Sequence, residues 1–579
     1  MTSPASATRS ASKLAEARHV VLDTAFGAGA AFLATVARRR AGEPLHYLAI
    51  APAVPDMATL AALAAVLPGL AAQWPVDVPG LHRLHLPQEQ LTLDLLAGPA
   101  DDWLAEIVAR VDEFIIPAPL EAIRALQRLA APAATLRIRH ADEQALRKLR
   151  AAGFTVAGDA DGEWLHAVYT SRKPQPPRAP RPERRAVVIG AGVAGSAACE
   201  RLAARGWQVT LIERHDAPAQ EASGNRAGIF MPLLSRDDNI PTRLTRAAFL
   251  YAQRAWLQLG GIDPQAPGPE AGEGGIRGRQ CGVLQLARDA AHALLQKEVV
   301  DARHYPQQYV RWLDAAQASA MLGAPTPFGA WHFPQGGWAT PATACRAMLR
   351  ACGDRLHRLF HAEALRLERG GDGWRVLAAD GRQLASAPTV ILASGAGATA
   401  LAQARELPLY TMRGQVTHLQ EDAFPSLQLV VCREAYMTPP VDGIVSVGAT
   451  YDKSADRQLW QSSQDENLLR AEEILGSPHG AGAPLQGRVG FRTMAPDRLP
   501  LVGALPDSTI DARAERLRDL ARHAGLHTLL GYASRGLIWA PLAAEILACQ
   551  LEDEPLPIEA TLAAALDPGR FLLKQRRKL

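Results

Sequence analysis

Residues 186–214 read AVVIGAGVAGSAACERLAARGWQVTLIER and contain a complete strand–turn–helix–strand unit. Val187–Ile189 form an apolar run typical of a buried strand. Three glycines follow it in the spacing G-x-G-x-x-G, namely Gly190, Gly192 and Gly195. They allow a tight turn, close approach of the backbone to a pyrophosphate and close packing of helix on strand. Glu213 ends the second strand, where a carboxylate can accept hydrogen bonds from ribose hydroxyls. The stretch therefore predicts a dinucleotide site.

Two later segments favour FAD over a nicotinamide cofactor. The first, TVILASGAGATAL at 389–401, is a strand that ends in small residues such as Gly395, as needed where backbone approaches the adenylate half again. The second, GYASRGLIWAPLAAEIL at 531–547, is a glycine-rich turn at the start of a helix. Because the first N–H groups of a helix are free to bind a ligand, this turn is predicted to face the flavin ring. The residues concerned are Gly531, Ser534, Gly536 and Leu537.

The chain of 579 residues is long enough for several domains. Its clearest break is the Pro- and Arg-rich segment SRKPQPPRAPRPERR at 171–185, which predicts a stiff linker between domains at 1–170 and 186–579. In the first domain, apolar runs alternate with Ala- and Leu-rich helical stretches, one of them at 120–130, which predicts a Rossmann-like α/β sheet. In the second, long helices and hairpins follow the dinucleotide unit, one hairpin being predicted by the Asp-Gly turn in WRVLAADGRQLAS at 374–386. We therefore expect an FAD-binding Rossmann domain with an inserted antiparallel sheet.

The net charge and the cysteine content exclude few classes of protein. The formal net charge is +3, and basic runs at 38–40, 172–185 and 574–578 are typical of solvated linkers and tails. The six cysteines are scattered, so we expect free thiols and no metal site. The first residues lack an apolar signal core and no segment is apolar enough to span a membrane. We therefore expect a cytoplasmic protein without a membrane partner.

Residues 186–560 resemble the glycine oxidase and D-amino-acid oxidase family of flavoproteins. The resemblance rests on EASGNRAGIFMPLLS (221–235), FPQGGWATPATAC (333–345), RGQVTHL (413–419), GFRTMAPDRLPLVG (490–503) and GYASRGL (531–537). With its N-terminal part, the chain resembles the MnmC family of bifunctional tRNA-modifying proteins over nearly its whole length. That implies FAD-dependent removal of the carboxymethyl group from 5-carboxymethylaminomethyl-2-thiouridine at the tRNA wobble position. Methylation of the exposed amine with S-adenosylmethionine then follows.

The resemblance also implies roles for particular residues. Arg492 matches the arginine that holds the substrate carboxylate in similar oxidases, and a guanidinium suits this role because it binds carboxylates bidentately. Arg535, in the turn nearest the expected flavin ring, is a second candidate, and a structural role is the alternative for both. The SGNR segment resembles one that contacts the FAD phosphate and the flavin edge, through Ser223, Asn225 and Arg226.

Four other residues have less distinctive surroundings. Tyr436 and Tyr451 could line the pocket, although packing in the core is the commoner role for such residues. His418 and His527 lie in apolar strands, and we expect both to be core residues rather than ligands.

A second loop, VLDTAFGAGAAFL at 21–33, resembles the first loop of an S-adenosylmethionine-dependent methyltransferase. Asp23, Gly27 and Gly29 keep the pattern and are the candidate cofactor contacts. Ala25 stands where the family has its first glycine, and its methyl group is expected to crowd the cofactor because such turns need glycine dihedrals. The second strand ends near Ala51 without an acid for the ribose.

The segment VDEFIIPAPLEAIRAL at 111–126 lacks the acid, glycine, asparagine and tryptophan of the family's catalytic segment. Its two acids, Asp112 and Glu113, stand at the wrong end of the predicted strand, and the family's N-terminal extension is missing. We therefore expect methyl transfer to be weak or absent. Binding of S-adenosylmethionine alone, or a scaffold or tRNA-docking role using basic residues at 137–140 and 147–150, stays open.

Two other functions remain for the whole chain. One is a glycine-oxidase-type enzyme that oxidises free amino acids or amines and carries a fused accessory domain. The other is a non-enzymatic tRNA-binding module. The motif at 221–235 and the fused α/β domain favour a tRNA-modifying enzyme over the first, and the intact dinucleotide loop speaks against the second.

Overall fold

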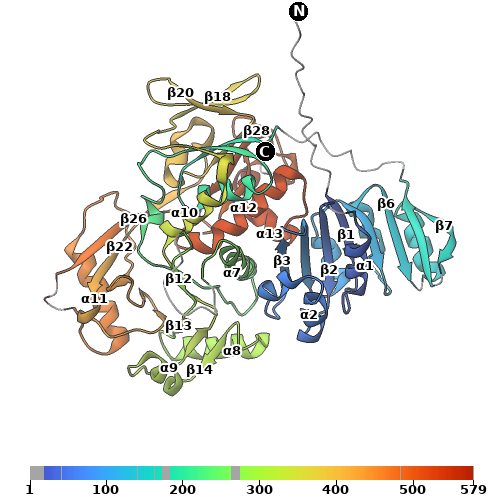
Figure 1. Ribbon diagram of the computed structural model, residues 1–579. Coiled ribbons are helices and arrows are strands. Elements are labelled where there is room, and N and C mark those ends of the chain that lie inside the picture. Colours follow the sequence, from blue (N-terminus) through green and yellow to red (C-terminus); the bar gives the residue numbers. More distant parts are fainter. Residues whose placement is uncertain are drawn as a thin grey trace, which may run out of the picture. The chain divides into compact units, whose positions relative to one another are not determined.

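The computed structural model describes residues 18–40, 42–139, 141–161, 163–171, 183–262, 274–480, 482 and 484–577. Within them, one compact unit comprises residues 18–74, 83–105 and 109–171, and a larger one comprises 75–82, 106–108 and 183–577. Figure 1 colours the smaller unit blue to cyan. Most of the linker predicted at 171–185 lies outside the described residues, so that boundary stays a prediction.

The smaller unit is built on an eight-stranded sheet in the order β3-β4-β2-β1-β5-β6-β8-β7 (Figure 1). Its strands are β1 (His19–Asp23), β2 (Leu45–Ala51), β3 (Gly80–Leu86), β4 (Leu91–Ala97), β5 (Val111–Ile116), β6 (Ala130–Arg139), β7 (Phe154–Asp161) and β8 (Trp164–Tyr169). From β4 to β6 neighbours pair in parallel, whereas β8 is antiparallel to β6 and β7. The loops after β1 and β5 meet at the carboxyl edge, where ligands bind in such sheets. This is the predicted Rossmann-like sheet.

Its helices are α1 (Ala30–Arg38), α2 (Met57–Ala64), α3 (Ala100–Glu106), α4 (Leu126–Leu129) and α5 (Glu143–Ala151). The helix predicted over 120–130 is wrong in extent, because only α4 and a preceding 3-10 turn form there. Strand β6 begins at Ala130, which pairs with Val111 of β5. Pairing in the sheet therefore overrides the helical preference of the Ala- and Leu-rich sequence.

The larger unit contains the sheet that holds the dinucleotide loop, in the order β17-β10-β9-β21-β28-β27. Its strands are β9 (Arg185–Ile189), β10 (Gln208–Ile212), β17 (Leu356–Leu359), β21 (Thr389–Leu392), β27 (Leu501–Pro506) and β28 (Arg522–Leu530). All neighbours are parallel except β27 and β28. The loop after β9 thus lies beside the turns that follow β21 and β28, although these are hundreds of residues apart in sequence.

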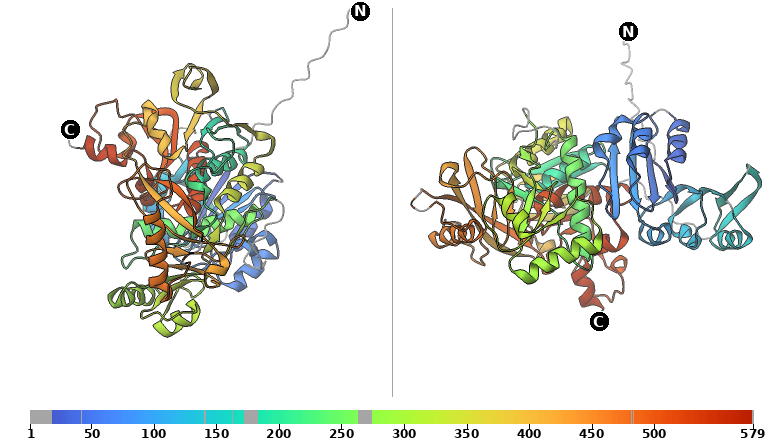
Figure 2. Two further views of the ribbon diagram at one scale, coloured as in Figure 1. Left: turned by 90° about the vertical axis from the view of Figure 1, so that its left-hand side faces the viewer. Right: turned by 90° about the horizontal axis from the view of Figure 1, so that it is seen from below.

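A second sheet, in the order β14-β15-β13-β23-β24-β25-β22-β26, is the inserted sheet. Its strands are β13 (Val283–Leu286), β14 (Arg311–Leu313), β15 (Ala330–Phe333), β22 (Tyr410–Gln420), β23 (Val430–Cys432), β24 (Tyr436–Met437), β25 (Ile444–Gly448) and β26 (Gln486–Met494). It is antiparallel apart from the pair β13 and β23, as predicted. With α11 (Gln461–Leu475), strands β22 and β26 form one end of this unit (Figure 1, Figure 2).

Two three-stranded sheets complete the unit. One consists of β11 (Gly228–Phe230), β12 (Gly278–Arg279) and β16 (Gly337–Ala339), and the other of β18 (Arg366–Gly370), β19 (Gly373–Leu377) and β20 (Gln383–Ala387). The second includes the hairpin predicted at its Asp-Gly turn.

Helix α12 (Gly536–Glu552) lies at the centre of the larger unit's core. It is buried on nearly every face, because α6 (Val193–Ala203) and α7 (Ile240–Gln258) both pack against it. Figure 1 shows α12 close to α7, and α10 (Pro341–Ala351) packs against α6. The remaining helices are α8 (Ala290–Arg303), α9 (Ala315–Leu322), α13 (Ala560–Leu566) and α14 (Arg570–Arg576). Within the described ranges, no helix combines the length and apolar character needed to cross a membrane.

Candidate active site

The glycine loop after β9 is closed by contacts that only glycine permits. Gly190 has a φ of +105°, and a Cβ there would lie 2.7 Å from the carbonyl oxygen of Ala393. A Cβ on Gly195 would lie 1.8 Å from the carbonyl oxygen of Gly190, so α6 packs directly onto the end of β9. The loop therefore brings the first turn of α6, the positive end of the helix dipole, to the edge of the sheet.

Two side chains complete this loop. The Glu213 carboxylate accepts hydrogen bonds from the backbone N–H groups of Ala191 at 2.7 Å and His215 at 3.0 Å. It thus fixes the loop, and its contact with a ribose stays a prediction. Ser223 Oγ accepts a hydrogen bond from Val193 N–H at 3.1 Å, so the predicted phosphate-side serine lies at the start of α6.

The turns predicted to return to the cofactor meet this loop through a chain of contacts. A Cβ on Gly395 would lie 3.3 Å from Thr493 Oγ1, and the Thr493 carbonyl accepts from Ala533 N–H at 3.0 Å. A Cβ on Gly536 would in turn lie 3.1 Å from Val193 of α6. Segments separated by hundreds of residues therefore surround one place at the carboxyl edge of the sheet.

Among the other residues predicted for the 531–537 turn, Gly531 has a φ of +76°, Ser534 is exposed and Leu537 is buried.

The SGNR segment is held from the inserted sheet. Arg488 of β26 donates to Asn225 Oδ1 at 3.1 Å and to the carbonyl oxygen of Gln220 at 2.9 Å. Arg226 behaves differently from its neighbours: it is exposed, and its charge acts on His418 and Asp442. Its backbone carbonyl accepts from the Thr340 hydroxyl at 2.8 Å. The phosphate contact predicted for Arg226 stays a prediction that these surroundings do not favour.

Arg492 of β26 presents a guanidinium with most of its donors available. Its Nη1 donates to the Thr450 carbonyl at 3.1 Å, and its Cζ lies 4.2 Å from the ring centre of Tyr451. Gly414 on the neighbouring strand β22 makes room for it, because a Cβ there would lie 2.1 Å from Nη1. No carboxylate of the described residues forms an ion pair with Arg492. A guanidinium with free donors and no acid partner is suited to an external carboxylate.

Arg535 is the second unpaired cation of this region. It donates to the Met231 carbonyl at 3.2 Å, and within the described part of the chain it has no acidic partner. Burial lowers the pKa of its guanidinium, while Cys432 and Tyr451 act in the opposite direction. Burial also raises the pKa of Tyr436 to about 12, against the effect of the Arg492 charge. Tyr451 thus lies near both predicted catalytic arginines, and Tyr436 lies near Arg492.

For Tyr451 the expected core role is wrong. Its side chain is 55% exposed, and it lies on the Arg492 guanidinium rather than in an apolar cluster. The expectation for His418 is confirmed, because it is buried and burial lowers its pKa to about 4. His527 is half-buried, and burial lowers its pKa to about 4 as well.

These features fit FAD. The glycine loop and the start of α6 would hold the pyrophosphate, Glu213 lies at the end of β10, and the 531–537 turn lies next to the strand that carries Arg492. When bound, a flavin supplies a two-electron acceptor for a carbon–hydrogen bond beside an amine.

In the loop after β1, the candidate acid Asp23 already binds groups of the protein itself. Asp23 is fully buried; it accepts from Ala25 N–H at 3.0 Å and from the Tyr47 hydroxyl at 2.8 Å, and burial raises its pKa. The positive φ values fall on Gly27 (+55°) and Gly29 (+79°). Ala25 is not among the described residues with positive φ, so alanine suits the backbone at this position, and the predicted crowding of the cofactor by its methyl group stays a prediction.

Beyond this loop, the carboxyl edge of the smaller unit's sheet offers little for methyl transfer. Strand β2 ends at the buried Ala51, as predicted, and β5 ends in apolar residues. Asp112 and Glu113 act at the opposite edge, where Asp112 accepts from Val20 N–H and Glu113 pairs with Arg38.

The basic stretches proposed for tRNA docking are largely ion-paired. Arg137 lies 3.4 Å from Glu113, Arg147 pairs with Glu143, and Arg139 and Lys148 have acidic partners of their own. Their charge is therefore mostly balanced within the unit.

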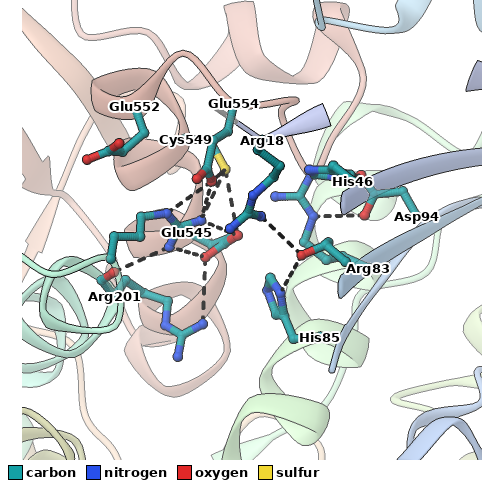
Figure 3. Close-up of polar contacts among 12 residues, drawn as sticks. Arg18, His46, Arg83, His85, Asp94, Arg201, Glu545, Cys549, Glu552 and Glu554 are labelled. Carbon is teal, nitrogen blue, oxygen red and sulfur yellow. Dashed lines mark hydrogen bonds and ion pairs between the residues drawn. The ribbon is translucent and has the colours of Figure 1, made fainter. Parts of the chain in front are cut away.

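Each unit also contains one buried ionic cluster (Figure 3). In the smaller, Asp94 accepts from Arg83 and lies 2.8 Å from His46 Nε2. In the larger, Glu545, Cys549 and Glu554 gather closely enough to bind a metal, but Arg205 donates to both carboxylates at 2.8 and 2.7 Å. A guanidinium already occupies the position that a cation would need, so we assign no metal there. All six cysteines are free thiols, as expected.

Sequence reasoning missed three residues of this site. Arg488 holds the SGNR segment, Gly414 makes room for Arg492, and Arg413 is fully buried with its guanidinium 3.9 Å from the Trp460 ring centre. Gly414 and Arg413 belong to the quoted motif RGQVTHL, which was the available signal. Arg488 had none, because its partners are over 200 residues away in sequence.

Comparisons with known proteins agree with this geometry. The family model of the FAD dependent oxidoreductases (DAO) matches residues 185–550. The tRNA 5-methylaminomethyl-2-thiouridine biosynthesis bifunctional protein MnmC of Azoarcus sp. (strain BH72) is 42% identical, over 97% of this chain and 91% of the relative. The protein of the same name from Burkholderia thailandensis is 40% identical, over 96% and 90%.

Among solved structures, glycine oxidase from Geobacillus kaustophilus shares the fold. Its TM-score is 0.53 at 21% identity, and the match covers 67% of this chain and 99% of that one. The larger unit is thus an FAD-dependent oxidoreductase, and the chain as a whole belongs to the MnmC family of bifunctional proteins.

Proposed function

We propose that the larger unit oxidatively removes the carboxymethyl group from 5-carboxymethylaminomethyl-2-thiouridine at the wobble position of tRNA. The observation that carries this proposal is the pair Arg492 and Arg535, two cations without acidic partners among the described residues, beside the predicted flavin turn. The relatives' name supplies the tRNA and the thiouridine. A cytoplasmic location belongs to the same proposal.

The substrate arm is an N-substituted glycine, and each part of it has a match in the site. Its carboxylate would be held by the free N–H groups of Arg492, which reach it in a bidentate geometry. That contact orients the α-carbon for oxidation. Loss of a hydride from the α-carbon and of a proton from the nitrogen gives an imine, and a bound flavin is the two-electron acceptor for that hydride. Water then adds to the imine, releasing a free aminomethyl base and glyoxylate.

Arg535 would act on the same arm from the side of the flavin turn. Its guanidinium is buried, so its charge is weakly screened and an anion nearby is stabilised more strongly than at the surface. Tyr436 keeps its proton well above neutral pH and can donate a hydrogen bond to the arm.

The second activity implied by the family name is methylation of the new amine. We propose that this chain's product stops mainly at the aminomethyl stage. Strand β2 ends in Ala51 where the family resemblance requires an acid, and Asp23 is committed to Tyr47 and the loop backbone. Mass spectrometry of wobble nucleosides, in cells with and without this protein and without any other such methyltransferase, tests this. Appearance of the methylated nucleoside would overturn it.

The oxidation is tested with the purified flavoprotein under anaerobic conditions. The substrate is tRNA from cells that lack this protein and carry the carboxymethylaminomethyl base. We expect bleaching of the visible flavin band and release of glyoxylate. In steady-state assays with O2 admitted to reoxidise the flavin, Arg492→Met should lower kcat/KM about 10- to 150-fold, as expected for loss of charge-assisted hydrogen bonds. Arg382→Met, in an exposed turn, is the control.

The same experiment separates the alternatives. Turnover of free glycine or sarcosine, with none on tRNA, would establish a free amine oxidase instead. If the purified protein contains no flavin and binds none when FAD is added, the remaining function is that of a non-enzymatic tRNA-binding module.

A further inference from the structure

We propose that Tyr451 is the stacking platform for the nucleobase that carries the glycine arm. This inference rests on the proposed function, because it takes Arg492 as the carboxylate site. Tyr451 would recognise the base, whereas Arg492 would recognise the carboxylate of the arm.

The position of Tyr451 is unusual for a tyrosine of this protein. Its side chain is 55% exposed and its ring lies 4.2 Å from the Arg492 guanidinium carbon. In the described ranges the ring stacks on no other aromatic side chain, and its hydroxyl forms no hydrogen bond. The guanidinium orders the ring by a cation–π contact, while much of the ring surface stays open to solvent. A half-exposed ring that is already ordered can stack on a base at little further entropic cost.

The chemistry of the arm places the base at this ring. Only two methylene groups and a nitrogen separate the carboxylate from the pyrimidine ring. When Arg492 holds the carboxylate, the base must therefore lie within the length of this short arm from the guanidinium. Tyr451 is the aromatic side chain in contact with that guanidinium. Enzymes that act on single-stranded nucleotides commonly hold unpaired bases on aromatic side chains.

The surroundings of Tyr451 suit a nucleotide as well. Lys453 and Arg457 follow it in the same exposed segment, and Arg457 lies 5.4 Å from the ring centre of Phe491. Arg457 is only loosely tied, since its ion pair with Glu221 is at 3.4 Å. Such cations can meet the phosphates that flank an extruded base.

The test compares two substitutions at this position. Tyr451→Leu removes the ring and keeps an apolar side chain of similar reach, whereas Tyr451→Phe keeps the ring. Both holoenzymes are assayed with the modified tRNA for KM and kcat, and with glycolate as a carboxylate inhibitor of that reaction. Tyr410→Leu, another exposed tyrosine of the inserted sheet, is the matched control. Flavin content checks that each variant folds.

We expect Tyr451→Leu to raise KM for tRNA about 5- to 150-fold, the range for loss of one stacked base. The inhibition constant of glycolate should stay unchanged, and Tyr451→Phe should behave like the original protein. Equal weakening of tRNA and glycolate by Tyr451→Leu would show that the ring merely positions Arg492, and would overturn the inference. So would an unchanged KM for tRNA. If glycolate fails to inhibit the original protein, the carboxylate site itself, and hence the proposed function, is at fault.

Discussion

Gly414→Ala displaces Arg492 without changing its chemistry. In the structure, a Cβ at this position would lie 2.1 Å from Nη1, 2.5 Å from Cζ and 2.6 Å from Nη2 of Arg492. Carbon atoms do not approach so closely, so the guanidinium must move by about 1 Å. Misplacement of a substrate-binding group by about 1 Å can lower the rate about 100-fold. We therefore expect kcat/KM for the modified tRNA to fall by about two orders of magnitude.

The fold should tolerate this change. The clash is with the end of a flexible side chain, and Gly414 has no positive φ, so alanine suits its backbone. We expect the free energy of unfolding to change by less than about 1 kcal/mol. The control is Gly371→Ala, in the turn between β18 and β19, where an added Cβ would meet no atom within 4 Å.

The assay measures glyoxylate release from modified tRNA, the inhibition constant of glycolate and the flavin content of each variant. The reasoning predicts weaker glycolate inhibition and lower kcat/KM for Gly414→Ala, with full flavin content. An unchanged glycolate inhibition constant would refute it, because the carboxylate would then not depend on where the Arg492 guanidinium lies.

Three further outcomes follow from the same structure. Gly195→Ala places a Cβ 1.8 Å from the Gly190 carbonyl oxygen, so it should push α6 away from β9. We therefore expect less flavin absorbance per mole of purified protein, and a variant with full flavin content would contradict this. His418 has a folded pKa of about 4, below its usual 6.5, so it leaves stability unaffected above pH 6.5 and destabilises the fold as pH falls towards 4. His418→Leu should therefore flatten the loss of stability between pH 7 and pH 5 in urea unfolding; an identical loss would exclude His418 as its source. Arg413→Met leaves the carbonyls of Asp456 and Gln458 without their donor and should lower the free energy of unfolding, measured with urea, by about 2–4 kcal/mol. An unchanged urea midpoint would show that the guanidinium makes no net contribution to stability.

The sequence alone predicted those parts of the molecule that depend on local geometry. The spacing of Gly190, Gly192 and Gly195 requires a strand before it and a helix after it, because only that arrangement explains glycine at all three places. The apolar runs around it predicted the parallel sheet, and the Asp-Gly turn predicted the β19–β20 hairpin. The alanine at position 51 likewise predicted that β2 ends without an acid for the ribose.

Only the tertiary structure decided what individual polar side chains do. Glu213 bonds to the loop backbone, Arg226 is exposed and its charge acts on His418, and Tyr451 lies exposed on Arg492 instead of in the core. These outcomes depend on contacts between strands such as β22 and β26, whose residues are far apart in sequence. A sequence pattern records which residues can turn, pair or be buried, but the partners of a long polar side chain are set by whichever backbone the fold brings beside it.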